Sequence, residues 1–266
     1  MHKILVSHES PISLLEHSIA YNDYDYCLVH LMDKYPDYAN FFKRSVLSNR
    51  EVLLDNSIFE LGTAFEPKEY AKKVEWLNPT YYILPDVLEN SIETQSSFRG
   101  FATIYNNLPG LKIGAVQGKT FKEISECYKF MSDNADYIAI SFDFSYYQTT
   151  GAGNTKFERY VDGRQQLIKN LIDRGIWNWN KPHHLLGTSL PQEFKYYVQN
   201  NIHNIRSCDT SNPVMAGLTG LQYAGDLGLQ IKPVGLLADN INKEVSFDEM
   251  DLIHYNVNAF KSIIGR

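Results

Sequence analysis

Residues 51–86, EVLLDNSIFELGTAFEPKEYAKKVEWLNPTYYILPD, contain two short apolar runs with an amphipathic segment between them. Each apolar run ends close to an acidic residue, the first at Asp55 and the second at Asp86. The segment between them begins with Glu66 and Pro67, as helices commonly do. The stretch therefore predicts a strand, a helix and a second strand, which is the unit from which parallel sheets are built.

The same alternation continues along all 266 residues. Short apolar runs predict eight strands, at residues 3–7, 27–31, 51–55, 81–85, 112–116, 137–141, 184–187 and 204–208. Amphipathic stretches predict helices at residues 67–77, 91–106, 120–134, 157–174, 191–200 and 247–264. This pattern predicts an α/β fold, a single (β/α)8 barrel domain over residues 1–266, with an open doubly wound sheet as the alternative.

The composition of the chain indicates where the protein is found and which kinds of site it can contain. The chain has no apolar run of about 18 residues and its first residues, MHKILVSHES, lack an apolar leader, so we expect a soluble cytoplasmic protein without a membrane partner. Cys27, Cys127 and Cys208 lie far apart, which argues against a disulfide framework or a structural zinc site. With a net charge of −6, a nucleic-acid partner would need a local basic face.

Polar residues interrupt the apolar runs at their carboxyl ends. In a parallel barrel these ends open into one mouth, where barrel enzymes carry their chemistry. We therefore expect the following residues to share one pocket: Asp55, Asp86, Gln117, Ser141, Asp143, Thr188, Ser189 and Asp209.

The residue types in this set favour glycosyl chemistry. One carboxylate can attack or stabilise an electron-poor sugar carbon, while a second carboxyl group moves a proton to the leaving group. Three such carboxylates are available at strand ends, Asp55, Asp86 and Asp209, beside the carboxamide of Gln117. We expect no metal ion and no cofactor in this reaction.

Six segments also resemble the tRNA-guanine transglycosylases, in the order found in that family and over most of the chain. They are LLDNSIFELG (53–62), ILPDVL (83–88), GAVQG (114–118), YIAISF (137–142), HLLGTSLPQEF (184–194) and IRSCDTSNP (205–213). The resemblance implies that Asp209 is the nucleophile and Asp55 the general acid and base. It also implies that Asp86 and Gln117 bind the guanine edge.

The resemblance places further residues beside the base. Phe59 stands where the family has an aromatic residue that stacks on it, and Leu186 or Gly187 would form the opposite wall. Ser141 and Phe142 replace paired glycines of the family, and DNSIFE (55–60) replaces its DSGGFQ-like motif. These departures affect the orientation of the base or the 7-substituent that the site accepts.

The chain lacks the family's zinc motif of cysteines and a histidine. It therefore most resembles the zinc-free phage and bacterial enzymes that insert 7-deazaguanine bases, such as the queuosine precursor preQ0, into DNA. This resemblance implies that the nucleic-acid partner is DNA, with tRNA as the alternative. If a phage encodes the chain, the protein would act in the host cytoplasm. An oligomer is possible. The target nucleotide would have to leave its stack to reach the pocket.

Residues 143–160 are polar, aromatic and glycine-containing, and they include Lys156 and Arg159. We predict a flexible loop here, with these two cations contacting nucleic acid, and a solvated loop is the alternative. His183 and His184 open a predicted strand and are expected to be structural or to lie near a phosphate.

Two other classes of function stay open. One is a metal-dependent barrel hydrolase with His8, Asp55, Asp86, His184 and Asp209 as ligands, although no HxH or HxxxH spacing favours it. The other is a catalytically silent nucleic-acid-binding subunit, for which a nucleophile and an acid would be unnecessary.

Overall fold

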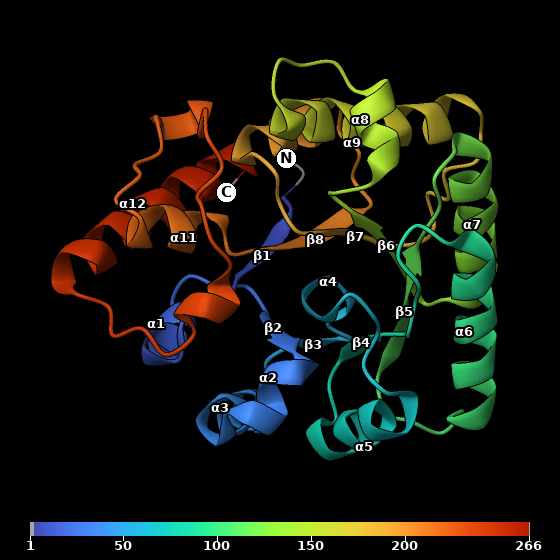
Figure 1. The fold of residues 1–266 in the computed structure, drawn as a ribbon, viewed down its shortest axis with the longest axis horizontal. Helices are drawn as coiled ribbons and strands as arrows, with labels where there is room; N and C mark the ends of the chain where they lie inside the picture. The colour runs from blue at the N-terminus through green and yellow to red at the C-terminus, as the bar shows by residue number, and fades with distance from the viewer. Residues whose placement is uncertain (1–2, 266) are drawn as a thin grey trace.

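The computed structural model describes residues 3–265, and it contains eight parallel strands that form a nearly closed barrel (Figure 1). The strands are hydrogen-bonded in the order β1-β8-β7-β6-β5-β4-β3-β2. The predicted (β/α)8 barrel is therefore confirmed. The strands are β1 (Leu5–His8), β2 (Asp25–Leu28), β3 (Val52–Asp55), β4 (Tyr81–Ile83), β5 (Leu111–Val116), β6 (Tyr137–Ser141), β7 (His183–Leu186) and β8 (Ile205–Thr210).

The barrel is completed by side chains between β1 and β2, which stand at the two ends of this order. The Oγ of Ser7 accepts a hydrogen bond from the Tyr26 amide at 3.0 Å, and a carboxylate oxygen of Asp23 accepts one from the Val6 amide at 2.8 Å. The amide of Asp23 in turn donates to the Val6 carbonyl at 2.9 Å. Polar side chains at this seam thus satisfy backbone groups that a strand ladder would otherwise pair.

Helices surround the strands, as Figure 1 shows for α5, α6 and α7. Three begin with a full capping box, which explains where they start: Thr120 with Glu123, Thr155 with Glu158, and Ser246 with Glu249. The α-helices are α1 (Leu15–Ser18), α2 (Val29–Lys34), α3 (Pro36–Leu47), α4 (Ile58–Leu61), α5 (Pro67–Leu77), α6 (Ser91–Ile104), α7 (Phe121–Asn134), α8 (Ser145–Thr150), α9 (Lys156–Asp173), α10 (Phe194–Gln199), α11 (Asn212–Leu218) and α12 (Phe247–Ile263). The 3-10 helices are η1 (Ile12–Leu14), η2 (Pro191–Glu193), η3 (Gly225–Leu227) and η4 (Leu237–Asn240).

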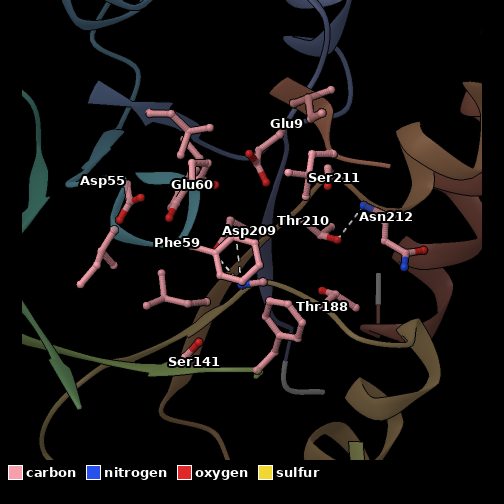
Figure 2. A pocket seen from close by; sticks show the side chains of 18 of the residues that line it. Glu9, Asp55, Phe59, Glu60, Ser141, Thr188, Asp209, Thr210, Ser211 and Asn212 are labelled. Carbon is pink, nitrogen blue, oxygen red and sulfur yellow. Dashed lines mark hydrogen bonds between the residues drawn. The ribbon is translucent and has the colours of Figure 1, made fainter. Parts of the chain in front are cut away.

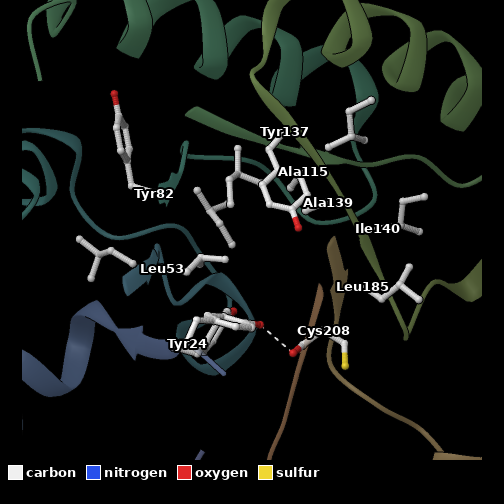
Figure 3. Close-up of a cluster of buried hydrophobic side chains, with 14 of the residues drawn as sticks. Tyr24, Leu53, Tyr82, Ala115, Tyr137, Ala139, Ile140, Leu185 and Cys208 are labelled. Atoms are coloured by element: carbon white, nitrogen blue, oxygen red, sulfur yellow. Dashed lines mark hydrogen bonds between the residues drawn. The ribbon is translucent and has the colours of Figure 1, made fainter. Parts of the chain in front are cut away.

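The barrel interior is filled with large side chains below the strand ends (Figure 3). Tyr24, Leu53 and Tyr137 are all buried, and the hydroxyl of Tyr24 donates to the Cys208 carbonyl at 2.6 Å. Burying one such side chain contributes about 1.5–3 kcal/mol. This packed interior forms a rigid base beneath the strand ends.

Two sequence expectations were wrong. Residues 143–160 are not one flexible loop, because they contain α8 and the first turns of α9, which is capped by Thr155. The second strand was expected at 27–31 but ends at Leu28, because the apolar residues that follow it begin helix α2. Within residues 3–265, no helix is both long enough and apolar enough to cross a membrane.

Candidate active site

A pocket lies at the carboxyl ends of the strands and encloses about 1180 Å³ of empty space, including space open to solvent. Asp55, Asp86, Gln117 and Asp209 all line it, from β3, the turn after β4, the turn after β5, and β8. We call these four residues the pocket floor. Of the residues expected at the pocket, Ser141, Thr188, Phe59, Phe142, Leu186 and Gly187 also line it, whereas Asp143 and Ser189 are not among its lining residues.

One part of the floor is a carboxylate held between two carboxamides. Asp86 is buried, and its two oxygens accept hydrogen bonds from Asn56 Nδ2 at 2.8 Å and from Gln117 Nε2 at 2.7 Å. Gln117 is oriented by the Glu89 amide, which donates to its Oε1 at 2.8 Å. Burial raises the pKa of Asp86, and the two amide donors oppose that rise by stabilising its charge.

Asn56 was not expected as a site residue. It is fully buried behind the pocket, where its Nδ2 also donates to the Leu84 carbonyl at 2.9 Å and its Oδ1 accepts from the Ile58 amide at 3.0 Å. It therefore ties the end of β3 to the turn that carries Asp86. In the sequence, its position directly after the strand-end Asp55 could have indicated that it belongs to the site.

A second part of the floor surrounds Asp209, which is buried and accepts hydrogen bonds from two groups. His184 Nε2 lies 2.9 Å from Oδ1, and the Gly187 amide lies 3.1 Å from Oδ1 and 3.2 Å from Oδ2. These donors fix the orientation of the carboxylate while leaving it in the pocket wall. A carboxylate held in this way is prearranged to attack a bound carbon atom.

Beneath Asp209, a chain of buried hydrogen bonds runs through the barrel interior. His184 Nδ1 lies 2.9 Å from the Ser207 hydroxyl, which is hydrogen-bonded to the Tyr137 hydroxyl. His184 also stacks on Tyr26, with ring centroids 6.0 Å apart. If His184 donates from Nε2 to the carboxylate, Nδ1 accepts from Ser207, so every ring nitrogen has a partner.

The two histidines differ in surroundings. Both were expected to be structural or to lie near a phosphate. His183 is buried and stacks on Trp177, with ring centroids 3.8 Å apart, and burial lowers its pKa to about 3. His184 instead contacts the candidate nucleophile Asp209.

Arg164, on α9, supports the floor from behind. It is fully buried and bonds both carboxylate oxygens of Glu193, at 2.6 and 2.9 Å. It also donates to the carbonyls of Leu186 at 3.0 Å and Gly187 at 3.1 Å. Because the Gly187 amide binds Asp209, this buried ion pair holds in place one of the donors to the carboxylate.

Asp55 lies in a group of carboxyl groups of the same charge. It is buried and its Oδ2 accepts from the Ser57 amide at 3.0 Å. Burial raises the pKa of Asp55 well above its usual range, and the nearby charges of Glu60 and Asp209 raise it further. These surroundings favour the protonated form of Asp55, as a general acid requires.

Glu60 and Glu9 also line the pocket, and neither was expected there from the sequence. Burial raises the pKa of Glu60 to about 7, and burial also raises that of Glu9, with Asp209 adding to both. One oxygen of Glu60 is buried without a hydrogen-bond partner in the described part of the chain. Figure 2 shows Asp55 and Glu60 on one side of the pocket and Thr188 and Asn212 on the other.

The pocket rim is built from Phe59, Phe142 and Lys232. The rings of Phe59 and Phe142 touch, with centroids 5.7 Å apart, and Lys232 Nζ lies 4.2 Å from the centre of the Phe142 ring. Phe142 also packs on Gly187, where an added Cβ would lie 2.5 Å from the ring and the backbone φ is +64°. Only glycine suits that position.

The cations expected to contact nucleic acid lie on α9. Lys156 is exposed, with Nζ 5.1 Å from the centre of the Tyr160 ring, and its charge helps to lower the pKa of Lys232. Arg159 is partly buried and donates to the Gly153 carbonyl at 3.3 Å. Lys156 is therefore near the rim, while Arg159 is partly engaged by its own loop.

The hydroxyl of Thr188 is available to a ligand. It is buried in the pocket wall, and the described residues give it no hydrogen-bond partner, so it can bind a sugar hydroxyl or phosphate oxygen.

Across residues 3–265, no group of three or more His, Cys, Asp or Glu side chains is arranged to hold a metal ion. His8, one ligand of the metal hypothesis, has its Nδ1 3.0 Å from Asn22.

No protein-family model matches this chain, and comparison with curated proteins finds none that matches it.

Proposed function

We propose that this protein is a guanine transglycosylase, which exchanges guanine in DNA for a 7-deazaguanine base such as preQ0. One observation carries the proposal: a firmly held carboxylate, Asp209, and a carboxyl group with a raised pKa, Asp55, line the same pocket. A nucleophile and a proton donor are the two groups that glycosyl transfer through a covalent intermediate needs.

The hydrogen-bonded group formed by Asp86, Asn56 and Gln117 supports guanine as the base that the site binds. Guanine has two adjacent donors, N1–H and the exocyclic amine, and the free lone pairs of the Asp86 carboxylate can accept from both. The second hydrogen of Gln117 Nε2 is available for the O6 atom, because only one hydrogen is used by Asp86. Adenine would offer the wrong pattern of donors and acceptors at this edge.

The proposed reaction has two half-reactions. In the first, Asp209 attacks C1′ of the target nucleotide, the C1′–N9 bond breaks, and guanine leaves with a proton from Asp55. In the second, the incoming base loses its N9 proton to Asp55, and N9 attacks C1′. The bond between C1′ and Asp209 then breaks, which regenerates both carboxyl groups.

DNA is preferred over tRNA because the chain resembles zinc-free relatives that act on DNA. The rim also suits a nucleic acid, since Lys232 lies over the Phe142 ring, which lines the pocket and can contact a base, and Lys156 is exposed nearby. The pocket is open to solvent, so a flipped-out base can enter it while the rest of the nucleic acid stays outside.

The test is to incubate the protein with radiolabelled preQ0 and, in parallel, guanine-containing DNA or tRNA. We expect label to enter DNA with release of guanine, and Asp209→Asn to slow this by at least about 10⁴-fold. Asp173→Asn, which removes an exposed acid on α9, is the matched control. Label entering tRNA alone would correct the substrate, and equal activity of Asp209→Asn would refute the nucleophile.

A direct test of the intermediate uses denaturing gels. Wild-type protein should carry covalently bound DNA when the incoming base is withheld, whereas Asp209→Asn should not. DNA that binds but is never trapped or exchanged by the wild type would favour a silent binding subunit instead.

A further inference from the structure

Residues 227–236, with the sequence LGLQIKPVGL, run beside the pocket mouth, and we call them the rim segment. In Figure 1 it belongs to the orange stretch that follows α11 and passes next to the barrel opening. Lys232, Pro233, Gly235 and Leu236 line the pocket from this segment. Leu227, Ile231 and Val234 are not among the residues that line it.

The rim segment exposes apolar side chains to an unusual degree. Sixteen large hydrophobic side chains are exposed in the part of the chain that the structure describes, and four of them lie within these ten residues: Leu227, Ile231, Val234 and Leu236. Val234 is 84% exposed and Ile231 is 65% exposed. Clustered apolar exposure beside a pocket indicates a binding surface, whereas single exposed residues need no explanation.

The segment is anchored at both ends. Leu229 is buried, and Gln192 holds its backbone, with Nε2 2.8 Å from the Leu229 carbonyl. Leu237, directly after the segment, is also buried. Gly235 has a φ of +97°, a backbone conformation that suits glycine, and it lets the chain turn back into the pocket wall after Val234. Ile231 and Val234 are thus held outward on a supported loop.

A cation lies between the two exposed side chains in the sequence. Lys232 packs over Phe142, with its Nζ 4.2 Å from the ring centre, and over Phe157 at 5.6 Å. Burial lowers its pKa to about 8, and the charge of Lys156 acts in the same direction. A partner that brings negative charge next to an apolar contact fits this combination, and nucleic acid has both a charged backbone and apolar base faces.

We propose that Ile231 and Val234 insert into the base stack of duplex DNA beside the target guanosine, while Lys232 contacts a neighbouring phosphate. This inference rests on the proposed function. A base that turns into the pocket leaves a gap in the stack, and unstacking costs free energy that apolar side chains in the gap offset. A second copy of this chain bound here would instead cover the mouth through which the substrate must enter.

The experiment compares two substrates, a duplex with a paired guanine and the same strand alone. The double variant Ile231→Ser/Val234→Ser should lose about tenfold or more of the exchange rate on the duplex. It should keep its rate on the single strand, where there is no stack to open. Ile104→Ser, which changes a residue of similar exposure (71%) on α6, is the matched control and should not affect either substrate.

A second measurement does not depend on exchange. A 2-aminopurine placed next to the target guanine becomes fluorescent when it unstacks, and wild-type protein should raise this signal on duplex DNA more than the double variant does. If the wild type exchanges guanine and the double variant matches it on the duplex, the insertion is refuted while the function stands. The insertion would also be refuted if the double variant lost the same fraction of its exchange rate on both substrates, or if the wild type exchanged guanine only in single strands.

The remaining outcomes also decide between the two proposals. If the wild type exchanges no guanine but unstacks the duplex through Ile231 and Val234, the proposed function fails and the insertion stands. Neither exchange nor unstacking would refute both. A wild-type dimer in sedimentation velocity that the double variant abolishes would show that a second copy covers this surface, which also refutes the insertion.

Discussion

The floor and the rim of the pocket are built differently. Each floor carboxylate is buried and accepts hydrogen bonds, as with Asp86 between two carboxamides and Asp209 beside His184. At the rim, Phe59 is half exposed and Val234 almost fully exposed. The floor can hold reacting atoms at fixed positions, whereas the rim can adapt to a large substrate. Precise chemistry and adaptable binding are therefore assigned to separate parts of one opening.

The largest expected effect concerns the support behind the floor. Arg164→Met leaves Glu193 buried without its cation, and we expect a loss of about 3–5 kcal/mol in the free energy of unfolding. Urea denaturation measures it. Lys169→Met, which removes an exposed ion pair on the same helix, is the control and should change stability far less. A similar small loss for both variants would show that the floor is not held by this pair.

The second prediction concerns the base-binding side of the floor. Asp86→Asn replaces a pure acceptor by a group that presents an amide to Asn56 and Gln117, so guanine loses its partner. We expect kcat/KM for guanine exchange to fall about 100- to 1000-fold. Steady-state kinetics measure this, with Asp173→Asn as control. Unchanged kcat/KM would mean that Asp86 does not contact the base.

The third prediction separates positioning from structure. His184→Phe removes one donor to Asp209, and we expect kcat to fall about 10- to 100-fold with little change in KM. His184→Gln keeps a donor and should restore part of kcat. Ser207→Ala, which leaves the His184–Asp209 contact in place, should have the smaller effect. A rise in KM alone, or no rescue by glutamine, would contradict a role in holding the nucleophile.

The smallest effect is a shift in pH dependence. The charge of Glu60 helps to raise the pKa of Asp55, so Glu60→Gln should lower that pKa. Guanine departure needs Asp55 protonated, and its rate falls as pH rises through this pKa. The falling limb for intermediate formation should therefore move to lower pH in Glu60→Gln. A limb that stays in place or moves to higher pH would mean that another group controls proton transfer.

The floor could be predicted from sequence because it lies where regular strands end. Apolar runs fixed the strands to within a few residues, and the polar residue after each run marked the mouth. His184 was missed as a partner of Asp209, although it lies two residues before Leu186 on β7 and so shares its inward face. A histidine inside an apolar run carries no sign of which buried group it meets.

The rim could not be predicted in this way. The rim segment lies in irregular chain after residue 219, where no periodicity indicates which side chains point inward. Lys232 reaches the pocket only because the segment folds back over the barrel. Burial in the folded chain raises the pKa of Glu9 and of Glu60, and the distant Asp209 adds to both. Such properties depend on tertiary contacts rather than on local pattern.

The seam between β1 and β2 has a consequence for dynamics. Its bonds depend largely on side chains such as those of Ser7 and Asp23, whereas neighbouring strands elsewhere pair through backbone ladders. Local opening should begin here, so the amides of Val6 and Tyr26 should exchange with deuterium sooner than those of β6. Glu9 follows β1 directly. Because β1 pairs with β8 and β2 pairs with β3, opening at the seam would move the wall that carries Glu9 and Asp209 relative to the wall that carries Asp55.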